Sequence, residues 1–507
     1  MTAIDRTGTV AVVGTGTMGQ GIAQVALLAG HPVRLYDVAP GRAGTAVDAI
    51  TVRLDRLVEK GRLTAEERDA ARGRLGAVTE LGGLADARLV VEAILEELGA
   101  KQQLFTALET VVSEDCLLAT NTSSLSVTAV GGALARPGRL VGLHFFNPAP
   151  LLPLVEVVSG FATDEAAAAR AHATAAAWGK TPVRCADTPG FIVNRVARPF
   201  YAEAFRLYEE RAADPATIDA VLRESGGFRM GPFELTDLIG QDVNEAVTRS
   251  VWESCFHDPR FTPSLAQRRL VEAGLHGRKS GRGWYAYGEG ESRPEPHTAE
   301  PRKAPATVGV HGDLGPAAVL AELIAEAGIE VTRDRTSFVS EGFIALPGGT
   351  RLTLTDGSAA TTDLSGTHIR FDLALDYRTA TRIALAPSDL ASPEALSDAI
   401  GLFQALGKQV SVIDDVPGMI VARTVAMLAD FATEAVARGV AGAEDVDTAM
   451  RLGVNYPRGP LEWADELGVG WVRRVLWGLD DAYPTGRYVP SQPLLRRATA
   501  EGKLFSS

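Results

Sequence analysis

The sequence contains few cysteines, no long apolar run and no excess of positive charge. Its three cysteines, Cys116, Cys185 and Cys255, lie far apart and form no metal-spaced pair. This sparse, odd set argues against a disulfide framework and indicates a reducing compartment, the cytoplasm. No run reaches the roughly 18 uninterrupted apolar residues that cross a membrane. The formal net charge of −13 disfavours a nucleic-acid surface, although local basic groups can still bind an anionic small ligand.

The length and the apolar content indicate several domains. A chain of 507 residues predicts about three or four, and 46% hydrophobic residues can fill their cores. Residues 8 to 30 are rich in glycine, alanine and valine, but they lack a basic n-region and have a regular glycine spacing. Both features argue against a secretory signal peptide.

The first β-rich run is followed by a glycine turn and a helical segment. Residues 8–13 predict a strand, residues 20–28 a helix, and residues 32–37 a second strand that ends in an acid. Between the first strand and the helix lies the turn Gly14-Thr15-Gly16-Thr17-Met18-Gly19. Its glycines allow a tight turn, a close backbone approach to a pyrophosphate and close helix packing. This order predicts a dinucleotide-binding domain; the alternative is a turn that serves packing only.

Asp37 indicates which dinucleotide is bound. It lies 23 residues after Gly14, where a carboxylate accepts a hydrogen bond from a ribose 2′-hydroxyl. A carboxylate at this position also repels a 2′-phosphate. The sequence therefore predicts NAD rather than NADP as the cofactor.

One histidine and one carboxylate stand in the apolar stretch from residue 143 to residue 158. Three prolines between them exclude a regular helix, so we expect a strand ending near His144, a loop, and a buried strand that carries Glu156. A buried glutamate is costly unless it is paired, and a carboxylate beside an imidazole fixes its tautomer. His144 and Glu156 are therefore a candidate base and its partner; the alternative is a structural histidine near an unrelated glutamate.

Further polar residues follow the ends of predicted strands. Glu92 ends a buried strand, and residues 117–124 form a strand that runs into a polar turn containing Ser123. Ligands bind at the carboxyl ends of the strands in doubly wound sheets, so we expect Glu92, Ser123 and His144 to share one crevice. The alternative for Ser123 is a plain turn, which also uses Asn and Ser.

The segment from residue 40 to residue 75 predicts charged helix. Arg53 and Lys60 lie in it and are candidates for contacts with the phosphates of a ligand. A solvated helix face is the alternative, and on sequence alone the charge pattern favours it.

The pattern changes after the last predicted strand of this domain. A helix over residues 164–178 and a strand over residues 181–185 are followed, from residue 189 to residue 287, by a helical pattern that predicts an all-α domain. Residues 288–305 are charged and proline-rich, which is typical of a linker. Asn194 lies at the junction of the two domains, a usual place for a substrate site; the alternative is a helix-start residue that bonds backbone.

The second half of the chain repeats part of the first. The segment Pro189-Gly190-Phe191-Ile192-Val193-Asn194-Arg195 recurs 228 residues later as Pro417-Gly418-Met419-Ile420-Val421-Ala422-Arg423. The same offset takes Gly231-Pro232-Phe233-Glu234 to Gly459-Pro460-Leu461-Glu462. An ungapped match of this length indicates a duplication.

The repeat lacks the polar groups singled out in the first half. At the same offset, His144 corresponds to Asp372, Glu156 to Ala384 and Asn194 to Ala422. The strand at residues 307–310 leads to a turn without the three-glycine spacing, Gly312-Asp313-Leu314-Gly315. We therefore expect residues 306–412 to form a reduced, inactive Rossmann-like copy and residues 413–507 a second helical domain.

The motifs of the N-terminal half occur together in a known family. They are the glycine turn, Asn121-Thr122-Ser123-Ser124, His144-Phe145-Phe146-Asn147-Pro148, and the segments at 189–195 and 231–234. As a set they resemble 3-hydroxyacyl-CoA dehydrogenases over residues 8–287. The added helical domain is similar to the long bacterial form, which is associated with 3-hydroxyadipyl-CoA oxidation in phenylacetate breakdown. The resemblance implies an N-terminal Rossmann-like doubly wound sheet (1–188), a helical substrate and dimerisation domain (189–287), and then a degenerate tandem copy of both.

The resemblance also implies roles for individual residues. His144 corresponds to the catalytic base and Glu156 to its carboxylate partner, and Ser123 and Asn194 correspond to polar groups around the substrate hydroxyl and thioester. The implied NAD site comprises Gly14, Gly16, Thr17, Met18, Gly19, Asp37, Glu92, Asn147 and Lys279. The implied CoA contacts are Arg53, Lys60 and Ser123, and no metal is implied.

The implied reaction is the NAD-dependent oxidation of a (3S)-3-hydroxyacyl-CoA to the 3-oxoacyl-CoA. The alternatives are a 3-hydroxybutyryl-CoA dehydrogenase, a related hydroxyacid dehydrogenase that does not use CoA, and an NAD-binding structural protein without turnover. The expected partner is an acyl-CoA substrate, with neither nucleic acid nor membrane. We expect the two helical domains to pack as an intrachain pseudo-dimer, with a homodimer as a further alternative.

Overall fold

The computed structural model describes residues 2–334, 342–500 and 502–504. These residues form two compact units. The first unit comprises the chain up to residue 195 together with residues 438–454, and the second comprises residues 196–437 and the chain from residue 455 onward. A segment of the C-terminal repeat therefore belongs to the N-terminal unit. The domain boundaries predicted at 188, 287, 305 and 412 stay predictions, and the last two predicted domains include residues outside the described ranges.

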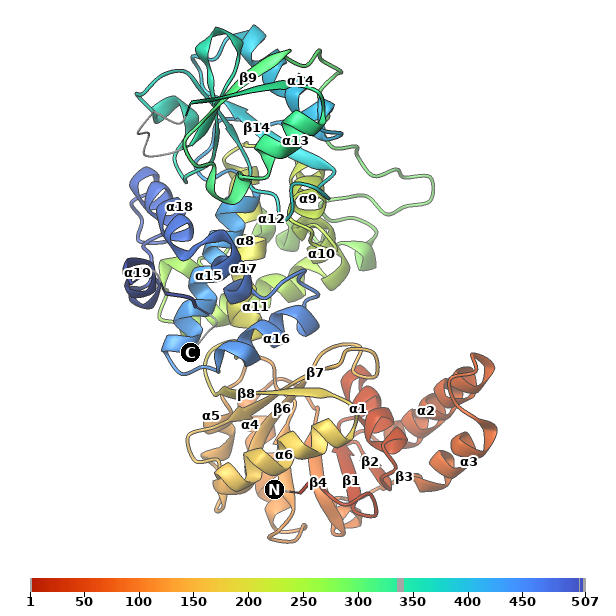
Figure 1. Cartoon of the computed structure of the whole chain (residues 1–507). Coiled ribbons are helices and arrows are strands. Elements are labelled where there is room, and N and C mark those ends of the chain that lie inside the picture. The colour runs from red at the N-terminus through yellow and green to blue at the C-terminus, as the bar shows by residue number, and fades with distance from the viewer. Residues whose placement is uncertain (1, 335–341, 501, 505–507) are drawn as a thin grey trace. The chain divides into compact units, whose positions relative to one another are not determined.

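The first unit is built on a doubly wound sheet, which confirms the predicted fold class (Figure 1). The strand order is β3-β2-β1-β4-β5-β6-β7-β8, and neighbouring strands are parallel except for the antiparallel pair β6 and β7. The strands are β1 (Thr9–Val13), β2 (Val33–Tyr36), β3 (Leu75–Ala77), β4 (Ala87–Glu92), β5 (Leu117–Thr120), β6 (Leu140–Phe145), β7 (Leu154–Ser159) and β8 (Thr181–Ala186). The helices are α1 (Thr17–Leu28), α2 (Arg42–Glu59), α3 (Ala65–Arg74), α4 (Leu98–Glu109), α5 (Val127–Gly131), α6 (Glu165–Ala177), α7 (Val193–Val196) and α16 (Ala443–Gly453).

One face of this sheet is packed against α1, α2 and α6. Val10 and Val12 of β1 share a buried core with Ile22 of α1, Ile50 of α2 and Ala171 of α6. Burying a branched aliphatic side chain stabilises the fold by about 1.5–3 kcal/mol. The strand ends that carry the polar residues are therefore fixed on a rigid support.

The antiparallel pair β6 and β7 places His144 directly opposite Glu156. Directly opposed residues of an antiparallel pair point to the same face of the sheet. Nearby, a Cβ added to Gly142 of β6 would lie 2.7 Å from the Cβ of Val158 in β7, so the two strands approach closely here. The predicted order of strand, loop and strand is confirmed.

The second unit contains a second, mixed sheet and most of the two helical segments, which are residues 196–287 and, apart from 438–454, residues 413–507. The strand order of this sheet is β10-β9-β11-β12-β13-β14-β15. Its strands are β9 (Thr307–His311), β10 (Glu330–Asp334), β11 (Phe343–Ala345), β12 (Arg351–Leu354), β13 (His368–Phe371), β14 (Arg382–Pro387) and β15 (Gln409–Val412). The helices are α8 (Arg198–Glu209), α9 (Pro215–Glu224), α10 (Pro232–Ile239), α11 (Gln241–Ser254), α12 (Leu265–Glu272), α13 (Leu320–Glu326), α14 (Pro393–Ala405), α15 (Val421–Ala437), α17 (Pro460–Leu467), α18 (Val469–Ala482) and α19 (Gln492–Thr499).

A buried charged cluster joins α8 of the first helical segment to α15 of the second. Arg423 of α15 donates to Glu203 (2.8 Å) and to Glu210 (2.7 Å). Arg487 and Tyr488, which lie beyond α18, also bond the carboxylate of Glu203, at 3.0 and 2.8 Å. The side chains of Glu203, Arg423 and Arg487 are fully buried. Buried charges persist only when they are paired, so each member of this cluster depends on the others.

The described residues contain no candidate membrane span and no candidate metal-binding group. No helix of that part of the chain is long and apolar enough to cross a membrane. No group of three or more His, Cys, Asp or Glu side chains there is arranged to hold a metal ion. Cys116 and Cys185 are buried thiols, and burial raises the pKa of Cys116 to about 12.

Candidate functional site

The glycine turn between β1 and α1 leaves open space in front of the helix. Gly14 has φ +92°, and an added Cβ would lie 2.5 Å from the carbonyl oxygen of Ala93. Gly16 is the N-cap of α1, and an added Cβ there would meet nothing within 4 Å. Gly14 is therefore required by the fold, whereas Gly16 keeps the N-terminus of α1 accessible. An accessible helix N-terminus with bare backbone suits a pyrophosphate, so these residues fit a dinucleotide. Thr17 and Met18 begin the helix and are exposed and half-buried.

Asp37 lies beside the turn, just after β2. Its Oδ2 accepts hydrogen bonds from the backbone N–H (2.9 Å) and hydroxyl (2.7 Å) of Thr15, and its Oδ1 accepts from the N–H of Ala39 (3.0 Å). Burial alone raises the pKa of Asp37, but the hydrogen bonds from Thr15 and Ala39 outweigh burial and lower the pKa below its ordinary value. The group is therefore an anion at neutral pH, as the discrimination against a 2′-phosphate requires.

Glu92 lies at the end of β4, and its carboxylate is bonded within the protein. Lys101 of α4 donates to its Oε1 at 2.5 Å, Thr120 to its Oε2 at 2.7 Å, and the backbone N–H of Ile94 to its Oε1 at 2.7 Å. The side chains of Glu92 and Lys101 are fully buried. These bonds tie the ends of β4 and β5 together next to Gly14. The predicted contact of Glu92 with NAD stays a prediction.

Glu96 holds the polar turn after β5, and sequence reasoning missed it. One oxygen accepts from the hydroxyl of Thr122 (2.7 Å), the backbone N–H of Ser123 (2.9 Å) and the hydroxyl of Ser124 (2.9 Å). Burial raises the pKa of Glu96, but the charge of Lys101, 3.2 Å away, and these hydrogen bonds hold it below the ordinary value. The available signal was its position after β4, because the carboxyl ends of the parallel strands β4 and β5 lie at the same edge of the sheet.

Ser123 and Asn121 connect the turn to β6. Asn121 Oδ1 accepts from the backbone N–H of Phe145, the residue after His144, at 2.9 Å. The N–H of Ser123 is bonded to Glu96, while its hydroxyl forms no hydrogen bond within the described residues. The structure therefore links the turn of Ser123 to the strand of His144 and leaves a hydroxyl available for a ligand.

His144 and Glu156 form the predicted contact. The Nδ1 of His144 lies 2.6 Å from Oε2 of Glu156, and both side chains are buried. Because the carboxylate accepts, Nδ1 carries the proton and Nε2 presents a lone pair. The ring lies against Phe146 and Phe191, with ring centroids 4.5 and 5.8 Å away. Nε2 has no hydrogen-bond partner in the described part of the chain, so it can accept a proton from a ligand.

The second oxygen of Glu156 fixes the turn that carries Asn194. Its Oε1 accepts from the backbone N–H groups of Ile192 (3.0 Å) and Val193 (2.9 Å). Asn194, the next residue, lies in α7 and is half-buried. One buried carboxylate thus positions both the imidazole of His144 and the backbone next to Asn194.

In the second sheet an aspartate fixes the corresponding turn. Asp372 follows β13, and its Oδ2 accepts from the N–H groups of Ile420 (3.0 Å) and Val421 (2.7 Å), which correspond to Ile192 and Val193. Burial raises the pKa of Asp372 to about 6. The repeat has therefore kept a carboxylate that holds the turn, moved it to the position of His144, and carries no imidazole there.

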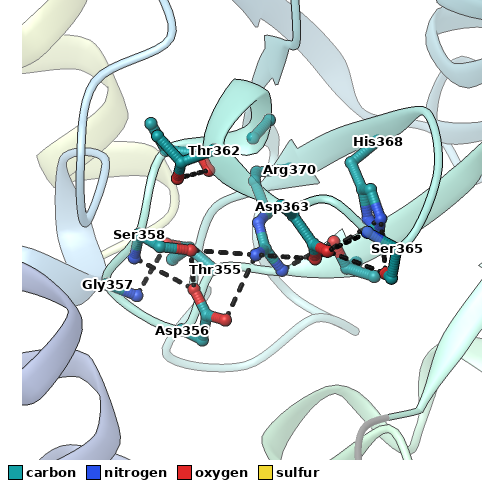
Figure 2. A network of polar contacts seen from close by, with 12 residues as sticks. Thr355, Asp356, Gly357, Ser358, Thr362, Asp363, Ser365, His368 and Arg370 are labelled. Carbon is teal, nitrogen blue, oxygen red and sulfur yellow. Dashed lines mark hydrogen bonds and ion pairs between the residues drawn. The ribbon is translucent and has the colours of Figure 1, made fainter.

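Figure 2 shows a polar cluster of the second sheet that contains Ser, His and Asp side chains. Arg370 lies at its centre and reaches Asp356 (3.1 Å) and Asp363 (3.4 Å). Ser365 Oγ and Asp363 Oδ2 both approach Nε2 of His368, at 3.1 and 3.3 Å. A catalytic triad needs its acid and its nucleophile on different ring nitrogens. This cluster therefore holds loops of the second sheet together and lacks the geometry of a second active site.

The loop after β6 lies against α1. A Cβ added to Gly21 of α1 would lie 3.2 Å from the side chains of Ala149 and Pro150. Lys180 holds this loop by donating to the carbonyl oxygen of Ala149 at 2.6 Å. Asn147 is exposed at its start. The loop that contains Asn147 is therefore packed on the helix that begins at the glycine turn, and the predicted contact of Asn147 with NAD stays a prediction.

Three predicted ligand contacts have different surroundings. The guanidinium of Arg53 in α2 donates to the side chain of Gln20 in α1, the residue that follows Gly19. Lys60 is the exposed C-cap residue of α2. Lys279 belongs to the second unit, where its ammonium bonds Asp242 at 2.7 Å. The structure therefore places Arg53 near the N-terminal part of α1, and the ligand contacts predicted for Arg53, Lys60 and Lys279 stay predictions.

Comparison with known families covers both halves of the chain. Residues 9–188 match the NAD-binding domain of 3-hydroxyacyl-CoA dehydrogenase, and residues 190–287 and 418–506 both match its C-terminal domain. Residues 352–417 match the 3-hydroxybutyryl-CoA dehydrogenase reduced Rossmann-fold domain.

Individual relatives agree with this assignment. A 3-hydroxyadipyl-CoA dehydrogenase of Escherichia coli K12 is 43% identical over 97% of this chain and 98% of its own length. A 3-hydroxybutyryl-CoA dehydrogenase of Mycobacterium tuberculosis is 42% identical over 56% of this chain and 99% of its own. A crystal structure described as 3-hydroxybutyryl-CoA dehydrogenase from Escherichia coli K12 covers 98% of this chain and 99% of that one, with a TM-score of 0.88 and 42% identity.

Proposed function

The chain belongs to the 3-hydroxyacyl-CoA dehydrogenase family, and we propose that His144 is the base of its reaction, the NAD-dependent oxidation of a (3S)-3-hydroxyacyl-CoA to the 3-oxoacyl-CoA. The observation that carries this proposal is the buried contact between His144 and Glu156, which leaves Nε2 with a lone pair. A general base of this kind contributes about 10²–10⁴-fold to the rate. A structural protein without turnover loses its support, because the relatives described above are named as dehydrogenases of CoA thioesters.

The protein groups divide the remaining tasks. Nε2 of His144 takes the proton of the substrate hydroxyl, and Glu156 stabilises the resulting imidazolium through Nδ1–H. Ser123 and Asn194 orient the substrate oxygen and the nearby thioester carbonyl by hydrogen bonds. Bound NAD supplies the acceptor for the hydride that leaves C3. Its pyrophosphate would be held at the N-terminus of α1 and its adenosine ribose by Asp37.

Glu156→Gln is expected to lower turnover. An imidazolium without a carboxylate beside it is less stable, so Nε2 of His144 accepts the substrate proton less readily. The amide also retains an oxygen for the N–H groups of Ile192 and Val193, so the turn remains held. Initial rates of NADH formation at neutral pH test this, and unchanged turnover would count against the pair.

We propose 3-hydroxyadipyl-CoA as the substrate. The support is the 43% identity to the Escherichia coli protein named for that substrate, which extends over nearly the whole of both chains. The second candidate is 3-hydroxybutyryl-CoA, because the full-length crystal structure of 42% identity is described by that name. A place in phenylacetate breakdown and a cytoplasmic location stay predictions.

A substrate series separates the two candidates. We expect kcat/KM for 3-oxoadipyl-CoA to exceed that for acetoacetyl-CoA by about tenfold or more, because a site built for a distal carboxylate rejects a substrate that lacks it. The measurement is NADH absorbance with 3-oxoacyl-CoA thioesters of increasing length, each with and without a terminal carboxylate. A preference for acetoacetyl-CoA would favour 3-hydroxybutyryl-CoA, and equal inactivity of all CoA thioesters would reject both.

We infer that the two helical segments form an intrachain pseudo-dimer in place of two separate subunits. The charged cluster around Glu203 supports this, because it joins α8 of one segment to α15 of the other. The aromatic contact of Phe200 with Tyr456, at 5.6 Å between ring centroids, adds a second link between the segments. Symmetric association of this kind is usual for two similar domains.

A further inference from the structure

We propose that residues 438–453 of the C-terminal repeat, which we call the brace, hold the active-site turn of the first unit in position and are required for full turnover. The proposal rests on the proposed function, because it assigns a positioning role in that reaction. The brace consists of the end of the segment after α15 and of helix α16, and it lies in the first unit beside β7 and β8 (Figure 1).

The brace is hydrogen-bonded to the end of β8. The backbone N–H of Ala186 donates to the carbonyl oxygen of Val440 at 2.7 Å, and the N–H of Arg184 donates to Oδ2 of Asp445 at 3.2 Å. Asp445 is half-buried at the start of α16, and burial raises its pKa. The strand that leads into the active-site turn is therefore paired with backbone and side chain from the C-terminal repeat.

The far end of the brace touches the turn itself. Gly453, the last residue of α16, lies so close that an added Cβ would be 2.7 Å from Cδ2 of Leu154 and 3.0 Å from Cγ2 of Val193. Leu154 begins β7, two residues before Glu156. Val193 donates its backbone N–H to Glu156 and precedes Asn194. Gly453 therefore packs against β7, which carries Glu156, and against the turn whose N–H groups bond the carboxylate of Glu156.

A displacement at Gly453 would reach both reacting groups. If Val193 moves, the hydrogen bond from its N–H to Glu156 lengthens and Asn194 moves with it. If Leu154 moves, β7 shifts and the distance from Glu156 to His144 changes. A misplacement of about 1 Å at a reacting group costs about 100-fold in rate. The brace is a positioning element, because none of its residues has been placed in contact with substrate or cofactor.

The same contacts recur in the second unit with the roles of the two repeats exchanged. At the offset of 228, Ala186 and Val440 correspond to Asp414 and Ala212, and the N–H of Asp414 donates to the carbonyl oxygen of Ala212 at 3.0 Å. Leu154 and Gly453 correspond to Arg382 and Ser225, and the hydroxyl of Ser225 donates to the carbonyl oxygen of Arg382 at 2.7 Å.

This recurrence allows a structural effect of the packing contact to be distinguished from an effect on catalysis. Each helical segment contacts the sheet of the other repeat at equivalent positions. The sheet contacted by Ser225 carries Asp372 in place of an imidazole, whereas the sheet contacted by Gly453 carries His144 and Glu156. Ser225 is therefore a matched control for Gly453: the packing position is equivalent, and its sheet lacks the catalytic pair.

The test compares Gly453→Val with Ser225→Val in the full-length chain. We expect Gly453→Val to lower kcat about 100-fold while KM for NAD stays within about twofold of the wild type. The glycine turn and Asp37 follow β1 and β2, whereas the brace lies beside β7 and β8 at the other end of the sheet. Ser225→Val is expected to leave kcat within about threefold. Leu154→Ala, which removes the side chain that the new methyl groups would meet, is expected to restore part of kcat when combined with Gly453→Val.

Each outcome decides the proposal. An unchanged kcat in Gly453→Val, an equal loss in Ser225→Val, or a loss confined to KM for NAD would overturn it. If Gly453→Val does not fold, Gly453→Ala and Ser225→Ala take the places of the valine variants, with the same criteria applied to a smaller, roughly tenfold loss of kcat. A wild-type chain that shows no NADH-dependent reduction of any 3-oxoacyl-CoA would instead reject the proposed function, so the two failures are distinguishable.

Discussion

His144→Gln is expected to retain NAD binding and to lower kcat by about 10²–10⁴-fold. Glutamine keeps a polar group beside Glu156, so the buried carboxylate remains paired and the turn at Ile192 and Val193 remains held. It cannot accept a proton at neutral pH, so the hydroxyl proton has no acceptor where Nε2 stood. The glycine turn and Asp37 are untouched, and binding of NADH should remain measurable by quenching of protein fluorescence.

The matched control for this variant is His368→Gln. His368 is also a buried histidine with a hydroxyl and a carboxylate nearby, but it lies in the second sheet (Figure 2). Its substitution should leave kcat near the wild-type value if the cluster is structural. Near-normal turnover in His144→Gln, or loss of turnover in His368→Gln alone, would contradict the assignment of the base to His144 in the first unit.

Glu203→Ala is expected to destabilise the second unit by about 3–5 kcal/mol, because it leaves the buried Arg487 without a carboxylate partner and Arg423 with Glu210 alone. The carboxylate accepts from Arg423 at 2.8 Å and from Arg487 at 2.5 Å, and all three side chains are fully buried. The surface pair of Arg268 and Glu272, 2.9 Å apart and mostly exposed, provides the control. Glu272→Ala should cost at most about 1 kcal/mol, because water screens an exposed pair.

The pH dependence of this contribution has a definite sign. Burial alone raises the pKa of Glu203, but the charges of Arg487 and Arg423 outweigh it and lower the pKa to about 2. A depressed carboxyl pKa stabilises the folded state above the ordinary pKa of glutamate. This contribution is therefore present at neutral pH and is lost as pH falls from about 4.5 towards 2, a range in which Glu203→Ala should lose its difference from the wild type.

Urea denaturation followed by tryptophan fluorescence measures this effect. Five of the six tryptophans lie in the second unit, so the signal reports mainly on it. Equal midpoints for Glu203→Ala and the wild type at neutral pH would show that the cluster does not hold the two helical segments together, and the pseudo-dimer would lose its main support.

The sequence predicted the parts of the first unit that depend on local pattern. The order of β1, glycine turn, α1, β2 and Asp37 follows from glycine spacing and short apolar runs, which act over neighbouring residues. The contact of His144 with Glu156 was predictable because prolines between two apolar runs leave few arrangements other than paired strands. In the second sheet, by contrast, the sequence predicted β9 alone, and β11, with three residues, is too short to show a strand period.

The contacts that the sequence did not reveal join residues far apart in the chain. Glu96 holds the turn of Ser123, and its partners become apparent only when β4 and β5 are side by side. The brace is another case, because Val440 and Ala186 are brought together by folding and not by any local signal. Asp372 also falls in this group: its alignment with His144 suggested a lost function, whereas its hydrogen bonds show a retained one.

Asp372, compared with the pair of Glu156 and His144, shows that holding the turn and accepting a proton are separable functions of this part of the sheet. In the repeat a carboxylate still holds the turn, although it is an aspartate after β13 and not a glutamate in β7. The repeat has no histidine at this position. The chain thus contains an internal control: two equivalent turns, each held by a buried carboxylate, of which only one lies beside the proposed active site. Differences in rigidity or sequence tolerance between them can then be ascribed to the reaction and not to the scaffold.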